Sequence, residues 1–335
     1  MRLLIWHEHQ TPPGQGGGGA ESMLRDQTEA LHRLGHTVAW LQSSQIEEAV
    51  RRFTPDMVQV QTIHNAFGVE PVTWLQENDI PHVWVLMDYW PFCGGRMLLK
   101  NWDEGCAAVD GVCDGQCAEG KANPRLLEVV NGSPVIALNR FTADIYRRNG
   151  LRCDGVVELG VDTNFFCLGE RDAEVSVYTS SAWAPYPAKG MKYLKEAIEG
   201  MGINVNLMTN VTREQIAQGL KRAHIFVFPS TYQETWGLCL QEAMASGCAC
   251  IASDVAGARA QIEHGVTGIL VPPRDPNALR GALQWLLKDN DKREELGRNA
   301  RDHSVADHNL EAMGRRWANL YTEVQSGFQG QLSRR

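Results

Sequence analysis

Short apolar segments alternate with amphipathic segments along most of this chain, and this alternation constrains its fold more than any other feature. In the first half, the pattern predicts strands over 3–6, 37–41, 57–60, 83–87 and 135–138 and a helix over 20–34. In the second half, it predicts strands over 175–179, 205–208, 225–228 and 250–252 and helices over 191–199, 213–221, 238–245, 278–287 and 310–324. Strands that alternate with helices indicate βα units and parallel sheets. We therefore expect an α/β protein in which this scheme occurs twice.

The joint between the two halves is expected between Gly160 and Arg171. We assign residues 1–165 to an N-terminal domain, 166–309 to a C-terminal domain, and 310–335 to a terminal helix. Parallel sheets bind ligands beyond the carboxyl ends of their strands. The functional site is therefore expected in the cleft between the domains, on loops that lead from strands into helices.

The composition is that of a globular protein, because 43% of the 335 residues are hydrophobic and 21% are charged. No run of eighteen apolar residues occurs, so we expect no membrane-spanning helix. The apolar start at residues 3–6 is too short for a secretory signal. Nine cysteines without such a signal favour a reducing, cytoplasmic location.

The net charge of −8 arises in the first half of the chain. Residues 1–165 carry 13 Lys and Arg against 21 Asp and Glu, whereas the two signs balance in the second half. Proteins that bind DNA or anionic membranes usually present a basic surface. We therefore expect no nucleic-acid partner, no stable membrane insertion, and a small acceptor that is not anionic. A local basic strip around Arg140, Arg147 and Arg148 is the feature that could oppose this expectation.

Residues 229–247, PSTYQETWGLCLQEAMASG, carry the strongest motif. Glu234 lies in a loop after a buried strand, and Glu242 lies eight positions later inside the following helix. The backbone amides at a helix start are unpaired and sit at the positive end of the helix dipole, which suits a phosphate. Gly237 lets a ligand approach the backbone closely. The two carboxylates can accept hydrogen bonds from sugar hydroxyls on either side of a diphosphate.

This stretch closely resembles the signature of the retaining, GT-B-fold glycosyltransferases of family four, the glycosyl transferases group 1. The resemblance continues through residues 251–257 and 263–273 and covers residues 175–290 well and the N-terminal half more weakly. It implies two Rossmann-like domains that face a central cleft, with the donor mainly on the C-terminal domain and the acceptor on the N-terminal one. It also implies that the terminal helix crosses back to the N-terminal domain. The implied reaction retains the anomeric configuration, and the leaving phosphate oxygen helps to take the proton of the acceptor.

The resemblance assigns roles to the residues of this motif. Glu234 would contact the hydroxyls of the donor sugar, and Glu242 would contact the ribose hydroxyls of the nucleotide. The backbone amides of Trp236, Gly237 and Leu238 would line the diphosphate. Glu234 is therefore both a donor-binding and a catalytic candidate.

Further donor contacts are implied outside the motif. Lys189 resembles the lysine of the family's lysine-glycine step and would neutralise the leaving diphosphate, so no metal is expected to be required for the chemistry. The family usually has a second cation just upstream, where this chain has Ser181, and a hydroxyl would replace that cation. Gly18 and Gly19 of the N-terminal glycine run would let their loop close over the donor phosphates; a plain flexible loop is the alternative.

On the acceptor side, the segment 87–90 departs from the family pattern. Related enzymes often have His-Asp-Tyr-Trp here, with the histidine facing the donor sugar, whereas this chain has Met87. Asp88 is retained and is the candidate base or acceptor-positioning group, with a turn cap as the alternative. His64 and Arg140 are candidate acceptor-binding residues, and for each of them a structural role is the alternative.

Four cysteines, Cys93, Cys106, Cys113 and Cys117, lie in an insertion rich in Gly and Asp. Four thiolates could hold a structural zinc. The irregular spacing also suits free or occasionally paired thiols. We expect this insertion to lie at the edge of the cleft and to shape the acceptor pocket.

The sequence thus predicts a metal-independent glycosyltransferase that moves a hexose-type sugar from a nucleotide-diphosphate sugar to an acceptor hydroxyl. The segment between Met191 and Pro229 is short for the family, so the sequence does not identify the nucleotide base. It also does not identify the sugar, the acceptor or the oligomeric state. The missing histidine and second cation favour an alternative, a catalytically weak nucleotide-sugar-binding module or partner subunit. A GT-B epimerase or phosphorylase is a further alternative.

Overall fold

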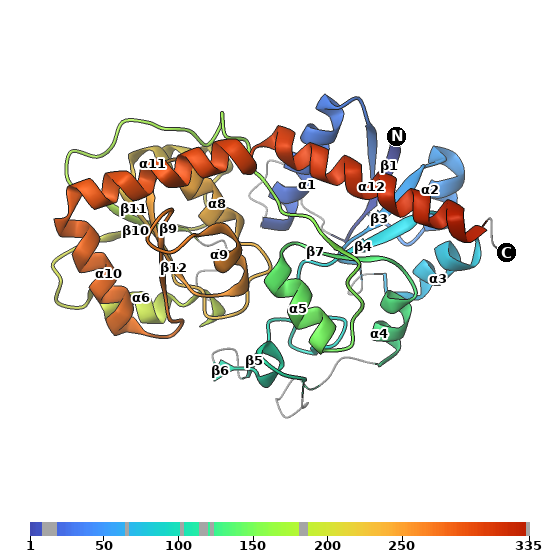
Figure 1. The fold of residues 1–335 in the computed structure, drawn as a ribbon, viewed down its shortest axis with the longest axis horizontal. Helices are drawn as coiled ribbons and strands as arrows, with labels where there is room; N and C mark the ends of the chain where they lie inside the picture. Colours follow the sequence, from blue (N-terminus) through green and yellow to red (C-terminus); the bar gives the residue numbers. More distant parts are fainter. Residues whose placement is uncertain are drawn as a thin grey trace.

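Two lobes, each with a central sheet covered by helices, lie side by side in this computed structural model (Figure 1). The structure describes residues 1–8, 19–63, 67–100, 104–113, 120, 124–180 and 187–332. Within these residues all strand pairs of the two main sheets are parallel. The predicted α/β fold with two parallel sheets is therefore confirmed.

The sheet of the first lobe has six strands in the order β2-β1-β3-β4-β7-β8. Its strands are β1 (Arg2–Trp6), β2 (Thr37–Leu41), β3 (Met57–Val60), β4 (His82–Val85), β7 (Val135–Ala137) and β8 (Gly155–Val156). Its helices are α1 (Gly19–Arg33), α2 (Ile46–Phe53), α3 (Glu70–Glu77), α4 (Pro124–Asn131) and α5 (Arg140–Arg148). A small antiparallel pair, β5 (Leu99–Lys100) and β6 (Glu104–Gly105), and a 3-10 turn, η1 (Ala107–Val109), belong to the cysteine-rich insertion.

The sheet of the second lobe has five strands in the order β10-β9-β11-β12-β13. Its strands are β9 (Val177–Ser180), β10 (Val205–Met208), β11 (Ile225–Phe228), β12 (Ala249–Ser253) and β13 (Ile269–Val271). Its helical segments are η2 (Pro187–Lys189), α6 (Met191–Ile198), α7 (Arg213–Arg222), α8 (Leu238–Ala245), α9 (Ala256–Gln261), α10 (Pro276–Lys288) and α11 (Asn290–Asp307).

The chain passes between the lobes twice, and the two crossings touch. Val161 forms a parallel bridge with Asn309, and its amide donates to the carbonyl of His308 at 2.9 Å. A Cβ atom on Gly160 would lie 2.6 Å from the same carbonyl oxygen, so the glycine permits this close approach. After the second crossing, helix α12 (Leu310–Leu332) packs along α1 in the first lobe (Figure 1).

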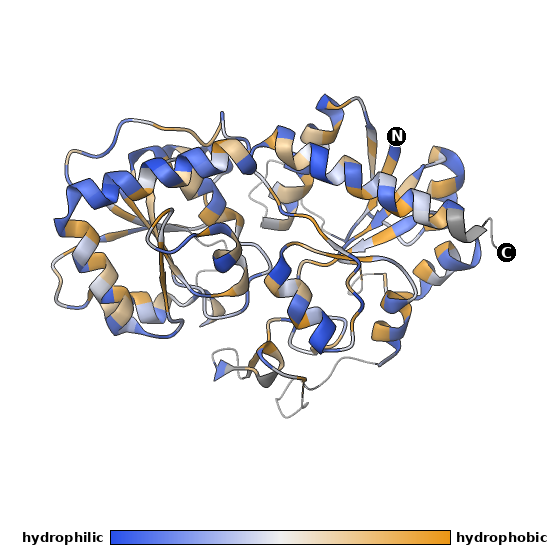
Figure 2. Ribbon diagram, in the orientation of Figure 1, coloured by the Kyte–Doolittle hydropathy of each residue, from blue (hydrophilic) through white to orange (hydrophobic). Residues whose placement is uncertain are grey.

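Apolar residues predominate in the strands at the centre of each lobe, and hydrophilic residues are frequent along the outer helices (Figure 2). Strands β3, β4, β11 and β12 are buried along their whole length, as expected for parallel strands covered on both faces. Helix α11 was not predicted because its sequence is polar on most sides. It is held instead by the Asp289 cap and by burial of Leu296 and Ala300.

Candidate functional site

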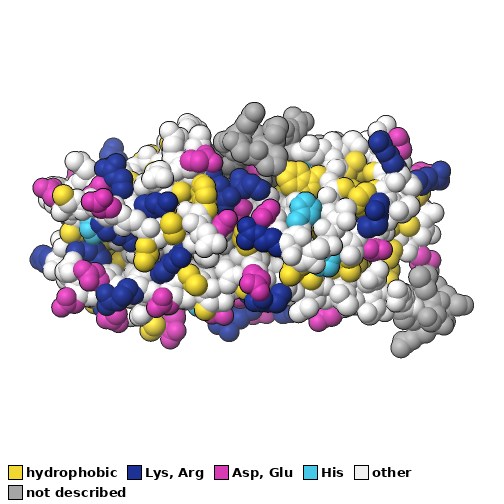
Figure 3. Space-filling view, turned by 90° about the horizontal axis from the view of Figure 1, so that it is seen from above, with side chains coloured by type: hydrophobic (Ala, Val, Ile, Leu, Met, Phe, Trp, Pro, Cys, Tyr) yellow, Lys and Arg dark blue, Asp and Glu magenta, His cyan; other side chains and the backbone are white. Residues whose placement is uncertain are grey.

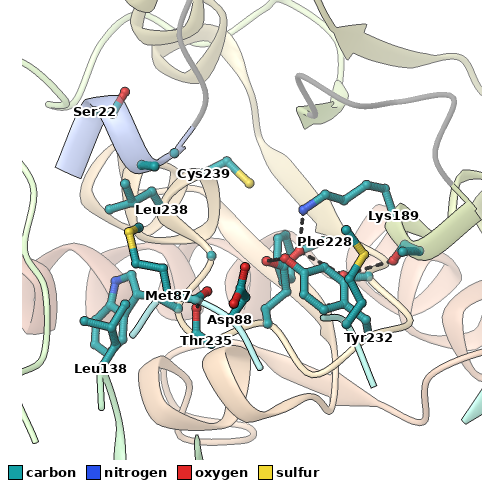
Figure 4. A pocket seen from close by; sticks show the side chains of 18 of the residues that line it. Ser22, Met87, Asp88, Leu138, Lys189, Phe228, Tyr232, Thr235, Leu238 and Cys239 are labelled. Carbon is teal, nitrogen blue, oxygen red and sulfur yellow. Dashed lines mark hydrogen bonds and ion pairs between the residues drawn. The ribbon is translucent and has the colours of Figure 1, made fainter. Parts of the chain in front are cut away.

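A cavity of about 510 Å³ lies between the lobes, where the carboxyl ends of both sheets meet. The first lobe contributes the start of α1 and the segment after β4. The second lobe contributes η2, the loop after β11 and the start of α8. The motif residues that follow β11 therefore meet the segment that follows β4, and Figure 4 shows Thr235 beside Met87 and Asp88.

Glu234 is the carboxylate with the most contacts in this cavity. Lys189 Nζ lies 2.6 Å from Glu234 Oε1, and Ser230 Oγ donates to the same oxygen at 3.0 Å. Tyr232 donates its hydroxyl to the other oxygen, and the lysine nitrogen lies 4.9 Å from the centre of the tyrosine ring. Figure 4 shows the Lys189 side chain pointing toward Tyr232, with a dashed line from its nitrogen. An ammonium group has three donors, so Lys189 can hold Glu234 and also bind an anion.

Gly190 explains how Lys189 reaches its partner. It has a φ of +70°, and a Cβ atom there would lie 1.8 Å from the carbonyl oxygen of Pro229. Only glycine allows the turn before α6 to pack so closely against the end of β11. The lysine-glycine step thus places the cation beside a residue that is 45 positions away in the sequence.

The start of helix α8 lines the cavity through Trp236, Gly237 and Leu238. Gly237 precedes the first helical residue with a φ of +91°, and a Cβ atom there would lie 2.8 Å from the ring of Phe228. The backbone amides of the first helical turn have no partners within a helix and favour an anion. The cavity therefore combines a helix start and a lysine, two features that bind phosphate groups.

Glu242, in the middle of α8, contrasts with Glu234. It is 6% exposed and lines the cavity, and no described residue gives its carboxylate a hydrogen bond or an ion pair. Burial raises its pKa to about 8. A buried carboxylate without partners has free capacity to accept hydrogen bonds from ligand hydroxyls.

Asp88 lies at the opposite wall, directly after β4, and also lines the cavity. Its Oδ1 accepts a hydrogen bond from the amide of Trp90 at 3.1 Å, so the side chain does form a cap of the next turn. Desolvation raises its pKa to about 6, and the nearby Arg96 acts in the opposite direction. A group with this pKa can exchange a proton near neutral pH.

Met87 stands beside Leu138 and Leu238 and makes one end of the cavity apolar (Figure 4). The carbonyl of Met87 accepts a hydrogen bond from Thr235 Oγ1 at 2.6 Å, which ties the motif loop of the second lobe to the end of β4. The Tyr89 hydroxyl adds a second tie, to the carbonyl of Gln233 at 2.8 Å. The two walls are thus joined directly beneath the cavity.

Arg140 is not brought to the cavity. It is the exposed first residue of α5, and its guanidinium lies 4.7 Å from the centre of the Phe141 ring. Asn139 caps this helix and donates to the carbonyl of Thr235 at 2.5 Å, so the cap and not the arginine faces the second lobe. Three other predicted residues, Gly18, His64 and Ser181, lie outside the described residues.

Some cavity residues were missed by the sequence analysis. Arg96 and Met97 of the cysteine-rich insertion line the cavity, and Arg96 has a φ of +64°, which no local pattern indicates. Tyr232 and Ser230 lie inside the predicted motif, where their position next to Glu234 was the available signal. Glu8 and Thr62 follow β1 and β3, at the strand ends where parallel sheets bind ligands.

In the cysteine-rich insertion, Cys93 and Cys113 have free thiols, and Cys117 lies outside the described residues. In the described part of the chain, no three His, Cys, Asp or Glu side chains cluster in a way that could hold a metal. The structural zinc therefore stays a prediction.

Among the described helices, none is both long and apolar enough to cross a bilayer.

A segment of the second lobe matches a known protein family. Residues 188–303 match the family described as glycosyl transferases group 1, which confirms the resemblance to that group over this segment. The matched segment contains Lys189, the 229–247 motif and all of helix α8.

Curated relatives match the same region. The chain is 32% identical over 125 residues to an alpha-D-kanosaminyltransferase of Streptomyces kanamyceticus, covering 37% of this chain and 32% of that protein. It is 41% identical over 91 residues to a D-inositol 3-phosphate glycosyltransferase of Corynebacterium kroppenstedtii, covering 27% of this chain and 20% of that protein. The matched segments thus span about a third or less of these relatives' own length.

Solved structures extend the similarity to both lobes. Sucrose-phosphate synthase from Thermosynechococcus elongatus has a TM-score of 0.76 at 17% identity and covers 97% of this chain and 99% of its own. HepE from Anabaena, solved in complex with UDP-glucose, has a TM-score of 0.68 at 16% identity and covers 96% and 100%. At these identities the likeness concerns the fold, which is the GT-B fold of glycosyltransferases.

Proposed function

We propose that this protein transfers a hexose-type sugar from a nucleoside-diphosphate sugar to an acceptor hydroxyl with retention of the anomeric configuration and without a catalytic metal. The observation that carries the proposal is the Lys189–Glu234 pair beside the start of α8. It combines a cation, a carboxylate and free helix amides in one cavity. A sugar joined to a diphosphate presents the matching groups, which are hydroxyls and phosphate oxygens.

In this proposal, each residue of the second-lobe wall has one task. Lys189 and the α8 amides bind the diphosphate, Glu234 accepts hydrogen bonds from the sugar, and Glu242 accepts them from the ribose. Gly18, Gly19 and Ser181 would complete the phosphate contacts. HepE was solved with UDP-glucose, which supports a donor of this class for the fold.

On the first-lobe wall, Asp88 positions the acceptor hydroxyl or takes its proton, and His64 is the remaining acceptor candidate. The acceptor is proposed to be small and not anionic, because the negative charge excess lies in residues 1–165. On the described part of the face that carries α11 and α12, basic and acidic side chains are interspersed (Figure 3). Clear binding to anionic liposomes or DNA at low salt that fades at higher salt would contradict this part of the proposal.

The first experiment is a hydrolysis and transfer assay with UDP-, GDP- and dTDP-sugars, each with and without excess EDTA. We expect slow release of nucleoside diphosphate from one donor class, faster release when an acceptor hydroxyl is supplied, and no loss in EDTA. Loss of turnover in EDTA that magnesium or manganese restores would overturn metal independence. Product anomers, read by proton NMR, test retention.

Met87 favours a second candidate function, a module that binds nucleotide sugars without turnover. A thioether cannot exchange a proton, and the labelled side chains beside it at this end of the cavity, Leu138 and Leu238, are apolar (Figure 4). The same assay separates the two functions. Tight nucleotide binding by calorimetry with no product from any donor would support the binding module.

A further inference from the structure

Buried polar side chains form a connected row through the first lobe, from helix α12 to the wall of the cavity. The row consists of Tyr321 in α12, Gln27 in α1, Gln59 in β3 and Gln61 directly after β3, each at most 1% exposed. The Tyr321 hydroxyl and Gln27 Nε2 both donate to Gln59 Oε1. Gln59 Nε2 in turn donates to Gln61 Oε1 at 3.3 Å, and the backbone amide of Gln61 donates to the carbonyl of Trp6. The side chain of Gln61 is therefore held at the end of the row.

The amide nitrogen of Gln61 contacts two methionine sulfurs. Its Nε2 lies 2.6 Å from Sδ of Met87 and 3.6 Å from Sδ of Met23. Within the described part of the chain these sulfurs are the partners of its two N–H groups, and a thioether sulfur is a weak acceptor. A buried N–H group that loses its partner costs free energy, because water does not replace the partner. The shorter contact therefore favours one position of the Met87 sulfur.

Met87 is a side chain that needs such a contact to keep one orientation. Methionine has three rotatable side-chain bonds and adapts its shape readily. The carbonyl of Met87 is held by Thr235 Oγ1, but this bond does not fix the side chain. The half-buried thioether lines the cavity beside Leu138 and Leu238 (Figure 4). In the described structure, the bond from Gln61 is the hydrogen bond that reaches its sulfur.

We propose that Gln61 is a positioning residue of the cavity, which holds the Met87 thioether in one orientation through the hydrogen bond to its sulfur. Gln61 is not among the described residues that line the cavity, so it acts through Met87. A thioether that is held in advance keeps the apolar end of the cavity in one shape and loses no rotamer freedom when a substrate binds. The effect on turnover rests on the proposed function, whereas the orientation of Met87 does not depend on it.

NMR of protein labelled with carbon-13 at the methionine methyl groups tests this orientation without any substrate. The Met87 signal is identified by its loss in Met87→Leu, and Met244, fully buried in the second lobe, serves as the internal reference. In the unaltered protein, the methyl-axis order parameter of Met87, which reports ps–ns motion, should approach that of Met244. Gln61→Leu and Gln61→Met both remove the donor, and each should lower the Met87 order parameter by about half. A Met87 methyl that is already averaged over rotamers in the unaltered protein would overturn the proposal, as would an unchanged order parameter in both variants.

The control variant Tyr321→Phe separates positioning from a general loss of stability. It removes a hydroxyl that donates to Gln59 and accepts from Gln27 Nε2 at 2.8 Å, at the far end of the row. The bond between Gln61 and Met87 stays intact, so Tyr321→Phe should lower the Tm and leave the Met87 order parameter unchanged. An equal fall of the order parameter in Tyr321→Phe and in the Gln61 variants would show that the row only stabilises the lobe, and the proposal would be wrong.

A double-mutant cycle on kcat/KM, with the donor and acceptor identified in the transfer assay, provides the functional readout. Gln61→Leu should lower kcat/KM about five- to tenfold, mainly through KM, because the substrate must then immobilise a free side chain. In the Met87→Leu background, where the sulfur is absent, the same change should alter kcat/KM by less than about twofold. Equal losses in both backgrounds would show that Gln61 does not act through Met87. If no donor is turned over, the proposed function fails, while the NMR measurement still decides whether Gln61 holds Met87.

Discussion

The two walls of the cavity differ in polarity and in how their charged side chains are paired. On the second-lobe wall, Glu234 is held by Lys189, Ser230 and Tyr232, and glycines at 190 and 237 let backbones approach closely. On the first-lobe wall, Met87 and Leu138 present apolar surface, and Asp88 has a single backbone cap. A wall of paired charges is suited to a ligand of fixed charge. The first-lobe wall combines this apolar surface with Asp88, whose pKa is raised, and with Glu8 and Arg96, so it is suited to a ligand selected by shape and by proton exchange.

The proposed division of tasks predicts the largest effect at Lys189. Lys189→Met removes the cation that lies beside Glu234 and the start of α8 on the second-lobe wall, and kcat should fall about 10²–10³-fold. Lys192→Met, in the exposed first turn of α6, is the matched control and should keep normal turnover. A loss below threefold in Lys189→Met would place phosphate stabilisation elsewhere.

The next largest effect is expected at Asp88, the carboxylate of the opposite wall. Its pKa is raised to about 6, so activity that needs the charged form should fall as the pH drops through 6. Asp88→Asn should lose that acidic limb and reduce kcat about 10²-fold at pH 8. A pH–rate profile of the two proteins checks both points. An unchanged acidic limb in Asp88→Asn would assign the titrating group to another residue.

Glu242 should show opposite effects on binding and on stability. Above pH 8, where Glu242 is charged, Glu242→Gln should weaken nucleotide binding by about 1.5–3 kcal/mol, because a charged acceptor is lost. The folded protein holds a proton up to about pH 8 that the unfolded chain releases near pH 4.5, so stability falls as the pH rises through this window. Glu242→Gln removes that loss and should raise the Tm at pH 8 but not at pH 4. Equal Tm values at both pH values would contradict the raised pKa.

The smallest effect is expected at Arg140, which the structure places outside the cavity. Arg140→Ala should change donor and acceptor KM by no more than about twofold, as for other exposed residues. Steady-state kinetics with both substrates checks this expectation. A tenfold rise in the acceptor KM alone would return Arg140 to the site and extend the first-lobe wall to the start of α5.

Several elements could be predicted from the sequence because they depend on neighbours along the chain. Strands β2, β3, β10 and β11 and helix α8 begin and end where the apolar pattern places them. The motif from Pro229 to Gly247 was recognisable as a loop followed by a helix. The helix starts at Leu238, directly after Gly237, and this boundary depends only on residues that are neighbours in the sequence. Helices such as α11 escaped prediction because their apolar face is narrow and their stability comes from packing.

The sequence by itself determined the α/β class, the two halves and the chemistry of the second-lobe motif, because spacing and residue type are local properties. Only the tertiary structure decided which of these groups meet. Lys189 reaches Glu234 across 45 residues because Gly190 packs on Pro229, and Arg213 meets Asp26 across 187 residues because the lobes close on each other. Such contacts depend on strand order and on lobe placement. No periodicity along the chain records either, so the sequence indicated neither the contact of Arg213 with Asp26 nor the position of Arg140 outside the cavity lining.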